Sequence, residues 1–329
     1  MTQMKKLTAS FVIIASLILF NSCSKSTSNP VETIAPATWT QVSSGLISNN
    51  RVNTLIASGT DLFAGMDGGV FLSTNNGTNW IAVDSGLPDI PEVHCFTVLP
   101  ASSGSISNLF AGTYSGVYHS SNNGTSWINV GLLNNFINCL AVSSSKIFAG
   151  TATGVLLSTD NGTSWVSVNT GLTDSIVYSL TVSGTNLFAG TSDGVFISPN
   201  SGTSWSAVSS GLSNQLTVYS FVVSGMNLFA ATWGGGVYLS TNNGTTWSAV
   251  NTGLTDTYVF ALATTGTNLF AGTGIGVFLS TSNGTSWAAV DSGLTESFSI
   301  HLAVVSFAVL GSNLFAGTAE GVWKRPLSE

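Results

Sequence analysis

Residues Ser158–Trp165 read S-T-D-N-G-T-S-W, and near-copies of this stretch recur through the chain. The other copies run from Ser73, Ser120, Ser198, Ser240 and Ser280 to Trp80, Trp127, Trp205, Trp247 and Trp287. Asn and Gly tolerate positive φ, and Ser, Asn and Thr side chains bind turn amides, so each copy is expected to form a tight turn. Counted from Trp39, successive tryptophans are 41, 47, 38, 40, 42 and 40 residues apart. A period near 40 residues built of strands and turns is typical of a β-propeller.

Each repeat carries two further markers ahead of the turn. One is a phenylalanine within a run like Asn186–Thr191, at Phe63, Phe110, Phe148, Phe188, Phe229, Phe270 and Phe315. The other is a valine after a glycine, at Val70, Val117, Val155, Val195, Val237, Val277 and Val322. In one repeat we predict four strands, at Val177–Val182, Leu187–Thr191, Val195–Ser198 and Trp205–Val208. Such a unit is too small to bury both of its faces, so it must stack on its neighbours.

The two ends of the repeat region show how the ring closes. Seven sets of the first three strands are present, but only six internal tryptophan strands. The seventh third strand, Gly321–Pro326, lacks a successor, and the missing fourth strand is found at Thr38–Val42. We therefore predict an all-β fold over residues 38–329. It is a seven-bladed β-propeller of four-stranded blades, whose last blade is closed by the N-terminal strand.

One position in the first strand of every repeat is small. Its residues are Thr54, Cys95, Cys139, Ser179, Ser220, Ala261 and Ser306. The first strands converge on the axis of a propeller, where bulky side chains would collide. We expect Cys95 and Cys139 to be buried free thiols. A disulfide between them stays open as an alternative, and it would require their Cα atoms to lie within about 7 Å.

Residues 1–22 form a predicted leader, with Lys5 and Lys6 ahead of the apolar run Leu7–Phe20. The cysteine that follows, Cys23, resembles the lipobox of bacterial lipoproteins, which implies lipidation of its thiol. Two acyl chains suffice for stable membrane anchoring. Ser24 is the residue type that the resemblance associates with the outer membrane, facing the periplasm or the surface; otherwise the protein is secreted. Residues 23–37 read as a flexible tether.

Composition excludes several classes of partner. Hydrophobic residues are 43% of the chain, charged residues 6%, and the formal net charge is −7. The arginines are Arg51 and Arg325, so the clustered positive charge that nucleic acids require is missing. The histidines His94, His119 and His301 occupy different repeat positions. We therefore predict no nucleic-acid partner, no metal and no cofactor.

The turn pattern S-x-D-x-G-x-T-W resembles the Asp-box, or BNR, repeat of sialidases, sortilin-type receptors and photosystem II assembly-factor-like proteins. The resemblance covers residues 38–327 and rests on the Ser, Gly and Trp positions of six turns. The family's aspartate is kept at Asp160, and the other turns have Asn75, Asn122, Asn200, Asn242 and Ser282. Because these residues still form hydrogen bonds, we expect the changes to affect stability more than function. The resemblance implies that the turn is structural and lies away from the active face.

Two forms of enzymatic activity make definite demands on the sequence. Sialidase chemistry, as the resemblance implies it, uses three arginines around the substrate carboxylate, and Arg51 with Arg325 cannot supply three. Another glycosidase would need two carboxylates across the scissile bond. The loops of the expected active face carry Asp67, Asp193 and Glu320 in one set and Asp89, Glu92, Asp174, Asp256 and Glu296 in the other. The last three follow the same Leu-Thr pair, so they are predicted to form turns.

Exposed aromatic residues are the better candidates for function. Tyr114 and Trp233 lie where other repeats have small residues, and an aromatic ring on a loop stacks on sugars or anchors a protein partner. The candidate ligand-binding residues are Trp233, Tyr114, Asp67, Asp193, Glu320 and Arg51. Tyr178, Tyr219 and Tyr258 would add to this surface, but we expect them to pack between blades.

Taken together, these patterns predict a monomeric, non-catalytic scaffold of the cell envelope. It would bind a protein or carbohydrate ligand through the loops of one face, and its lipid anchor would be its contact with the membrane. A glycan-cleaving enzyme and an assembly or stability factor remain as alternatives.

Overall fold

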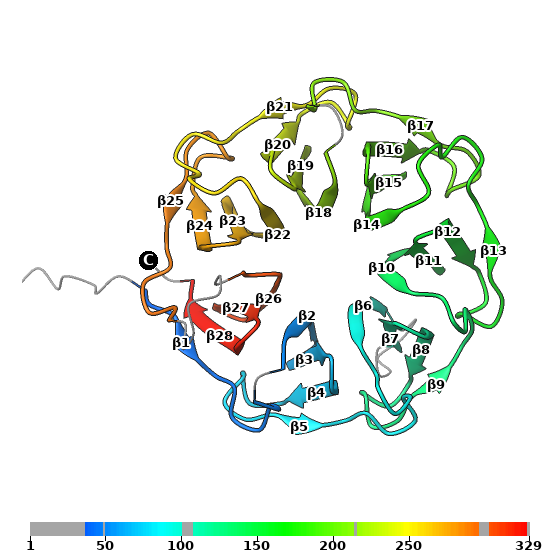
Figure 1. Cartoon of the computed structure of the whole chain (residues 1–329), viewed down its shortest axis with the longest axis vertical. Coiled ribbons are helices and arrows are strands. Elements are labelled where there is room, and N and C mark those ends of the chain that lie inside the picture. Colours follow the sequence, from blue (N-terminus) through cyan, green and yellow to red (C-terminus); the bar gives the residue numbers. More distant parts are fainter. Residues whose placement is uncertain (1–36, 49, 101–107, 214–215, 296–302, 328–329) are drawn as a thin grey trace, which may run out of the picture. The chain divides into compact units, whose positions relative to one another are not determined.

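The chain folds into seven four-stranded antiparallel blades around an axis, as the computed structural model shows (Figure 1). The structure describes residues 37–48, 50–100, 108–213, 216–295 and 303–327. The predicted leader, Cys23, nearly all of the tether, Glu296 and His301 lie outside these residues. The prediction of an all-β, seven-bladed propeller is confirmed. No helix among the described residues has the length and apolar character that crossing a membrane requires.

Within each blade the chain moves outward from the axis, one strand at a time (Figure 1). The innermost strands are β2 (Val52–Ser58), β6 (Val93–Leu99), β10 (Ile137–Ser143), β14 (Val177–Ser183), β18 (Val218–Ser224), β22 (Val259–Thr265) and β26 (Ser306–Leu310). The second strands are β3 (Asp61–Met66), β7 (Asn108–Thr113), β11 (Lys146–Thr151), β15 (Asn186–Thr191), β19 (Asn227–Thr232), β23 (Asn268–Thr273) and β27 (Asn313–Thr318). The third strands are β4 (Gly69–Ser73), β8 (Gly116–Ser120), β12 (Gly154–Ser158), β16 (Gly194–Ser198), β20 (Gly236–Ser240), β24 (Gly276–Ser280) and β28 (Gly321–Pro326). The outer strands are β5 (Ile81–Ala82), β9 (Ile128–Asn129), β13 (Val166–Ser167), β17 (Ser206–Ala207), β21 (Ser248–Ala249), β25 (Ala288–Ala289) and β1 (Thr40–Gln41).

The hydrophobic core lies between neighbouring blades. The second strands are buried along nearly their whole length, and the repeated phenylalanine of each is almost completely inaccessible. Phe63 and Val70 of the first blade pack with Val93 and Leu109 of the second blade in one apolar cluster. Each blade therefore completes its core on the next one, as the size of the repeat predicts.

The six repeated turns have the geometry that their sequence predicts. In the third blade, Ser158 Oγ accepts a hydrogen bond from the Gly162 N–H at 2.8 Å and donates one to Asp160 Oδ1 at 2.8 Å. Asp160 Oδ1 also accepts from the Ser164 N–H at 2.9 Å, and Asn161 has a φ of 57°. The other five turns repeat this pattern with asparagine or serine in place of the aspartate.

The tryptophans that close these six turns form a belt around the ring together with Trp39. Each indole Nε1–H donates to a valine carbonyl of the preceding blade at 2.7 to 3.0 Å. The pairs are Trp39–Val290, Trp80–Val42, Trp127–Val83, Trp165–Val130, Trp205–Val168, Trp247–Val208 and Trp287–Val250. The Trp205 N–H also donates to Thr170 O in the preceding blade at 2.8 Å. Consequently β17 is shorter than the predicted fourth strand Trp205–Val208.

The seventh blade is assembled from both ends of the propeller region, as predicted. Strand β1 pairs antiparallel with β28, with Thr40 opposite Lys324 and Gln41 opposite Trp323 (Figure 1). The Val42 N–H donates to Val322 O at 2.8 Å. Because Trp39 supplies the seventh indole, the belt continues across this junction.

The small residues of the innermost strands pack against the second strand of their own blade, and several also contact the next blade. Each member lies opposite a small residue of the second strand, namely Gly65, Gly112, Gly150, Gly190, Ala231, Gly272 and Gly317. Several members also bind the next blade: Ser179 Oγ donates to Val218 O at 2.9 Å, and Ser306 Oγ accepts from the Leu55 N–H at 2.7 Å. Small size is thus required by contact with the second strand and the next blade, rather than only by crowding at the axis. Cys95 and Cys139 are free thiols, and burial raises the pKa of Cys95 to about 12.

Candidate functional site

In six blades a β-bulge at the start of the innermost strand directs one side chain toward the axis. In the fourth blade the pairing register shifts between Val177 and Ser179, so Tyr178 between them is left out of the ladder. The same shift occurs in five other blades. A bulge leaves one residue unpaired and re-aims its side chain. The residues at this position, here called the bulge slot, are Asn53, His94, Asn138, Tyr178, Tyr219, Phe260 and, just ahead of β26, Val305.

All seven bulge-slot residues line one pocket of about 470 Å³, here called the axial pocket. Its remaining lining residues are Arg51, Asp67 and Phe136. Six slots lie in innermost strands and Val305 directly precedes the seventh, and Figure 1 shows these strands arranged around the axis. The pocket that the slots line therefore lies on the propeller axis. Its volume is typical of sites for small ligands.

The bulge-slot residues divide into two contiguous groups around the axis. Three consecutive blades contribute the polar side chains Asn53, His94 and Asn138, which we call the polar arc. The next three contribute Tyr178, Tyr219 and Phe260, which we call the aromatic arc. The seventh blade contributes Val305. The pocket therefore has one wall suited to hydrogen bonding and one suited to stacking.

The aromatic arc continues outward to one of the predicted anchors. The ring centroid of Tyr219 lies 5.3 Å from that of Tyr178 and 5.9 Å from that of Phe260. The Trp233 ring lies 5.9 Å from Tyr219 and 5.7 Å from Phe260. Trp233 is 49% exposed, and a β-bridge to Tyr258 holds its loop. The aromatic surface thus extends from the axis to the β19–β20 loop.

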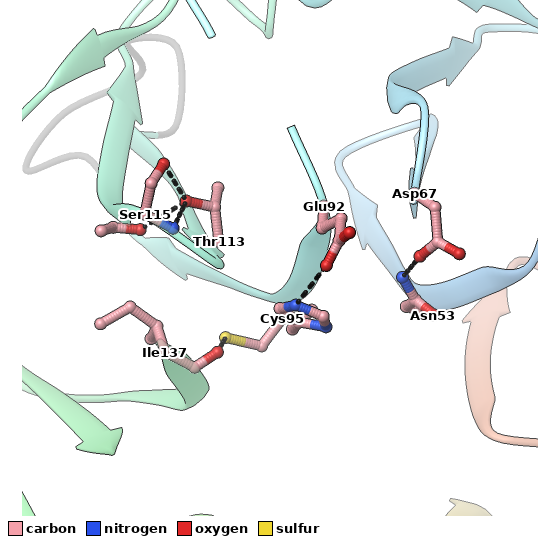
Figure 2. A network of polar contacts seen from close by, with 9 residues as sticks. Asn53, Asp67, Glu92, Cys95, Thr113, Ser115 and Ile137 are labelled. Atoms are coloured by element: carbon pink, nitrogen blue, oxygen red, sulfur yellow. Dashed lines mark hydrogen bonds and ion pairs between the residues drawn. The ribbon is translucent and has the colours of Figure 1, made fainter. Parts of the chain in front are cut away.

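The polar arc contains one hydrogen-bonded pair and one unpaired imidazole nitrogen. Asn53 Nδ2 donates to Asp67 Oδ1 at 2.7 Å, and Figure 2 shows this pair on the blade next to that of Glu92. His94 Nε2 lies 3.9 Å from Glu92 Oε2, which is too long for a hydrogen bond. That nitrogen is buried and has no hydrogen-bond partner within the described part of the chain.

Burial sets the charge state of His94. It lowers the pKa of the imidazole, and the carboxylates of Glu92 and Asp67 offset part of this effect. The ring stacks on Phe136 with centroids 4.4 Å apart, which fixes its orientation. Near neutral pH the side chain is therefore an uncharged group that can exchange a hydrogen bond with a ligand.

The structure brings some of the predicted site residues together and leaves others apart. Arg51 and Asp67 line the axial pocket, while Trp233 borders it through its contacts with the aromatic arc. Tyr114 is 61% exposed on the β7–β8 turn, and its ring centroid lies 5.7 Å from that of Phe136 in an edge-on arrangement. Asp193 and Glu320 lie on the β15–β16 and β27–β28 turns and are not among the lining residues.

Two acidic residues hold turns, as the sequence predicts. Asp174 Oδ2 accepts from the Asp193 N–H at 2.8 Å and from Ser192 Oγ at 2.6 Å. Asp256 Oδ1 accepts from the Tyr258 N–H at 3.0 Å. These carboxylates organise the loops around the pocket mouth and do not line the pocket.

Sequence reasoning missed most of the axial pocket. Asn53, Asn138 and Phe260 were not predicted, and Tyr178 and Tyr219 were expected to pack between blades. These two tyrosines do touch each other across two blades, but they also line the pocket. A usable signal exists: the residue just before each small-column member is asparagine, histidine, tyrosine, phenylalanine or valine, while the residue before it is always valine or isoleucine and the residue after it is always small.

The comparisons with known proteins concern the fold. The chain matches no protein-family model and no curated protein. One solved structure with the same fold is the extracellular domain of BT4673 from B. thetaiotaomicron, described as a one-component system (TM-score 0.72, 15% identity, 87% of this chain and 39% of that chain). A second is YCF48 bound to D1 peptide (TM-score 0.68, 15% identity, 90% of this chain and 98% of that chain). A third is the GH74 xyloglucanase of Xanthomonas campestris (TM-score 0.66, 18% identity, 89% of this chain).

The chain spans about two fifths of the BT4673 domain and 54% of the xyloglucanase, but 98% of YCF48. These proteins include the extracellular domain of a one-component system, a peptide-bound protein and an enzyme. At identities of 15 to 18% the likeness shows the fold alone, which is that of a seven-bladed β-propeller.

Proposed function

We propose that this chain is a non-catalytic binding scaffold whose axial pocket and adjoining loops take a protein or glycan ligand. One observation carries the proposal: the repeats are nearly identical, yet the slot that lines the pocket holds five different residue types in the seven blades. A surface needed only for folding would repeat like the rest. The same fold carries a bound peptide in YCF48, which supports a binding role for a propeller of this size.

The direct test is to fill the pocket. Val305→Trp adds volume at the bulge slot of the seventh blade and removes no side-chain hydrogen bond. Met226→Trp is the matched control, because Met226 is 85% exposed at the other end of its blade, between β18 and β19. Both variants and the native chain are screened on one glycan array and one peptide array. We expect at least one ligand that Val305→Trp loses and Met226→Trp keeps; capture that Val305→Trp leaves intact contradicts the proposal.

We further propose that the six repeated turns are Asp-box turns and that the chain is an envelope lipoprotein anchored through Cys23. The serine–asparagine hydrogen bonding of the turns supports the first point. The apolar run before Cys23 supports the second. In a bacterial host, the native chain should incorporate labelled palmitate and partition with membranes, and Cys23→Ser should do neither.

A glycoside hydrolase is the second candidate, because carboxylates from neighbouring blades border the pocket. Asp67 lines it, and Glu92 lies 3.9 Å from the lining residue His94. The fold likeness to a xyloglucanase fits this candidate. Release of reducing sugar from soluble glycans, lost in Asp67→Asn or Glu92→Gln, would establish it and overturn the non-catalytic assignment. A third candidate, an assembly factor, is favoured by the matching length of YCF48 and would capture peptide rather than glycan.

A further inference from the structure

We propose that the axial pocket binds a neutral saccharide, with a sugar ring stacked on the aromatic arc and its hydroxyls bound by the polar arc. The inference rests on the proposed binding function and names its ligand class. It follows from the division of the pocket into two walls, each built by three consecutive blades.

The aromatic arc provides the stacking surface. Tyr219 is inclined by 59° to Tyr178 and by 54° to Phe260, so the three rings are tilted with respect to one another rather than stacked face to face. All three are partly exposed and border the same cavity. A pyranose ring carries C–H groups on its faces and hydroxyls around its edge. The C–H groups can pack against the aromatic rings, and the tyrosine hydroxyls remain available to form hydrogen bonds with the sugar hydroxyls.

The polar arc provides partners for hydroxyl groups, which both donate and accept. Asn138 uses Nδ2 for Val177 O at 2.9 Å, and Asn53 uses Nδ2 for Asp67 at 2.7 Å. Neither amide oxygen has a protein donor among the described contacts, so both can accept a hydrogen bond from a ligand. His94 adds its buried, unpartnered Nε2. An unpaired buried polar atom is costly, and a ligand hydroxyl would relieve that cost.

Charge indicates a neutral ligand. Among the described residues that line the pocket, one is a cation, Arg51, and one is a carboxylate, Asp67. Glu92 stands just behind His94. The two lining charges cancel, so neither an acidic nor a polycationic saccharide would find an excess of opposite charge among the lining residues. A ligand without charge avoids both costs of desolvation.

Backbone pairing argues against an extended peptide in the same place. A peptide that adds a strand needs unpaired amides at a sheet edge. At the inner edges, side chains of the neighbouring blade already occupy such groups: Ser306 Oγ binds the Leu55 N–H, and Ser179 Oγ binds Val218 O. The axial pocket therefore offers side chains rather than strand edges to its ligand.

The test uses calorimetric titration of the whole chain with defined hexasaccharides. The neutral probes are maltohexaose, cellohexaose and mannohexaose; the charged probes are hexagalacturonate and the glucosamine hexamer. We expect one neutral probe to bind and neither charged probe to bind more tightly.

Tyr219→Leu keeps apolar volume but removes the flat ring, and should weaken that binding on the order of ten-fold. His94→Phe keeps the stack on Phe136 and should weaken it about five-fold. Met226→Ala is the control that leaves binding unchanged.

The results of these experiments separate the saccharide assignment from the broader proposal that the axial pocket binds a ligand. If the pocket captures a peptide that Val305→Trp blocks, and no neutral hexasaccharide binds, the saccharide assignment is overturned while the binding function stands. If neither array nor titration yields a pocket-dependent ligand, both fall. Tighter binding of a charged probe, or unchanged affinity in both Tyr219→Leu and His94→Phe, also overturns the assignment.

Discussion

Gly112 illustrates how a single residue limits the spacing between blades. A Cβ at this position would lie 2.4 Å from Cys95 Sγ and 2.6 Å from Ile137 Cγ2 of the next blade. The thiol therefore occupies space that only a glycine leaves open. The fifth blade tolerates Ala231 at the equivalent position, opposite the smaller Ser220.

Gly112→Ala should lower the free energy of unfolding by about 1–3 kcal/mol, because the added methyl group overpacks a filled site. Urea denaturation followed by tryptophan fluorescence measures the loss. Adding Cys95→Ala removes the closer of the two contacts, so the double variant should recover part of the stability. If the two changes are simply additive, the thiol is not what excludes a Cβ at this position.

His94 gives stability a dependence on pH that can be isolated by one substitution. Its pKa is lowered from 6.5 in the folded chain, mainly by burial. Below pH 6.5 the unfolded chain binds the proton more readily, so the folded state loses stability as pH falls through this range. His94→Phe retains the stack on Phe136 and should flatten this loss. Melting temperatures of both chains from pH 7 downward provide the measurement, and parallel curves would show that His94 does not contribute.

The repeated turn is the element that starts six of the seven outer strands. Its serine is buried and binds a backbone amide, whereas its third residue is exposed and varies among aspartate, asparagine and serine. The two positions should therefore respond differently to substitution. Ser158 and Asp160 of the third blade allow the comparison within one turn.

Ser158→Ala should cost about 1–3 kcal/mol of unfolding free energy, because the buried Gly162 N–H loses its acceptor. Asp160→Asn should leave stability at pH 7 close to native, since asparagine serves in four other turns. Hydrogen bonds from Ser164 and Ser158 lower the pKa of Asp160 below 3.8. Its contribution is therefore present above that pH and lost as pH falls further, and Asp160→Asn should remove this acid sensitivity. Denaturant curves at pH 7 and pH 3 test both statements.

At the element scale the strands were predictable and the bulge was not. Phe188 and Val195 mark their strands because buried residues recur at fixed positions. The bulge at Tyr178 depends on how two strands pair, and its slot accepts asparagine, histidine, tyrosine, phenylalanine and valine alike. No residue type marks it. The sequence therefore predicted the strands of each blade but not the side chain that the blade presents to the axis.

At the scale of the whole molecule, one belt of indole hydrogen bonds links all seven blades. Trp39 gives the belt its seventh member, with Nε1 bound to Val290 O at 2.7 Å. Counting repeats predicted this closure, because a missing outer strand in the last blade left Thr38–Val42 as its substitute. The axial pocket was not predictable in the same way, because Arg51, Asn138 and Phe260 meet only when the ring is closed.

Trp39→Ala should lower the free energy of unfolding by about 3–5 kcal/mol, since the side chain is 3% exposed and links two blades. Trp205→Ala, with 4% exposure inside a continuous blade, is the matched control for the loss of a buried indole. Hydrogen exchange distinguishes them. Amides of β28 should exchange faster in Trp39→Ala than in Trp205→Ala, and equal protection would show that the N-terminal strand does not hold the last blade.

The pairing of β1 with β28 also has a consequence for biosynthesis. Thr40 and Gln41 leave the ribosome among the first residues of the propeller, and Gly321–Pro326 among the last of it. At ordinary rates of translation, roughly 15 to 60 s separate the two events. During that interval the incomplete ring leaves the apolar faces of its two end blades uncovered. Holdase chaperones bind exposed apolar surface of this kind. Completion of β28 is then the step that allows the seventh blade to close on β1.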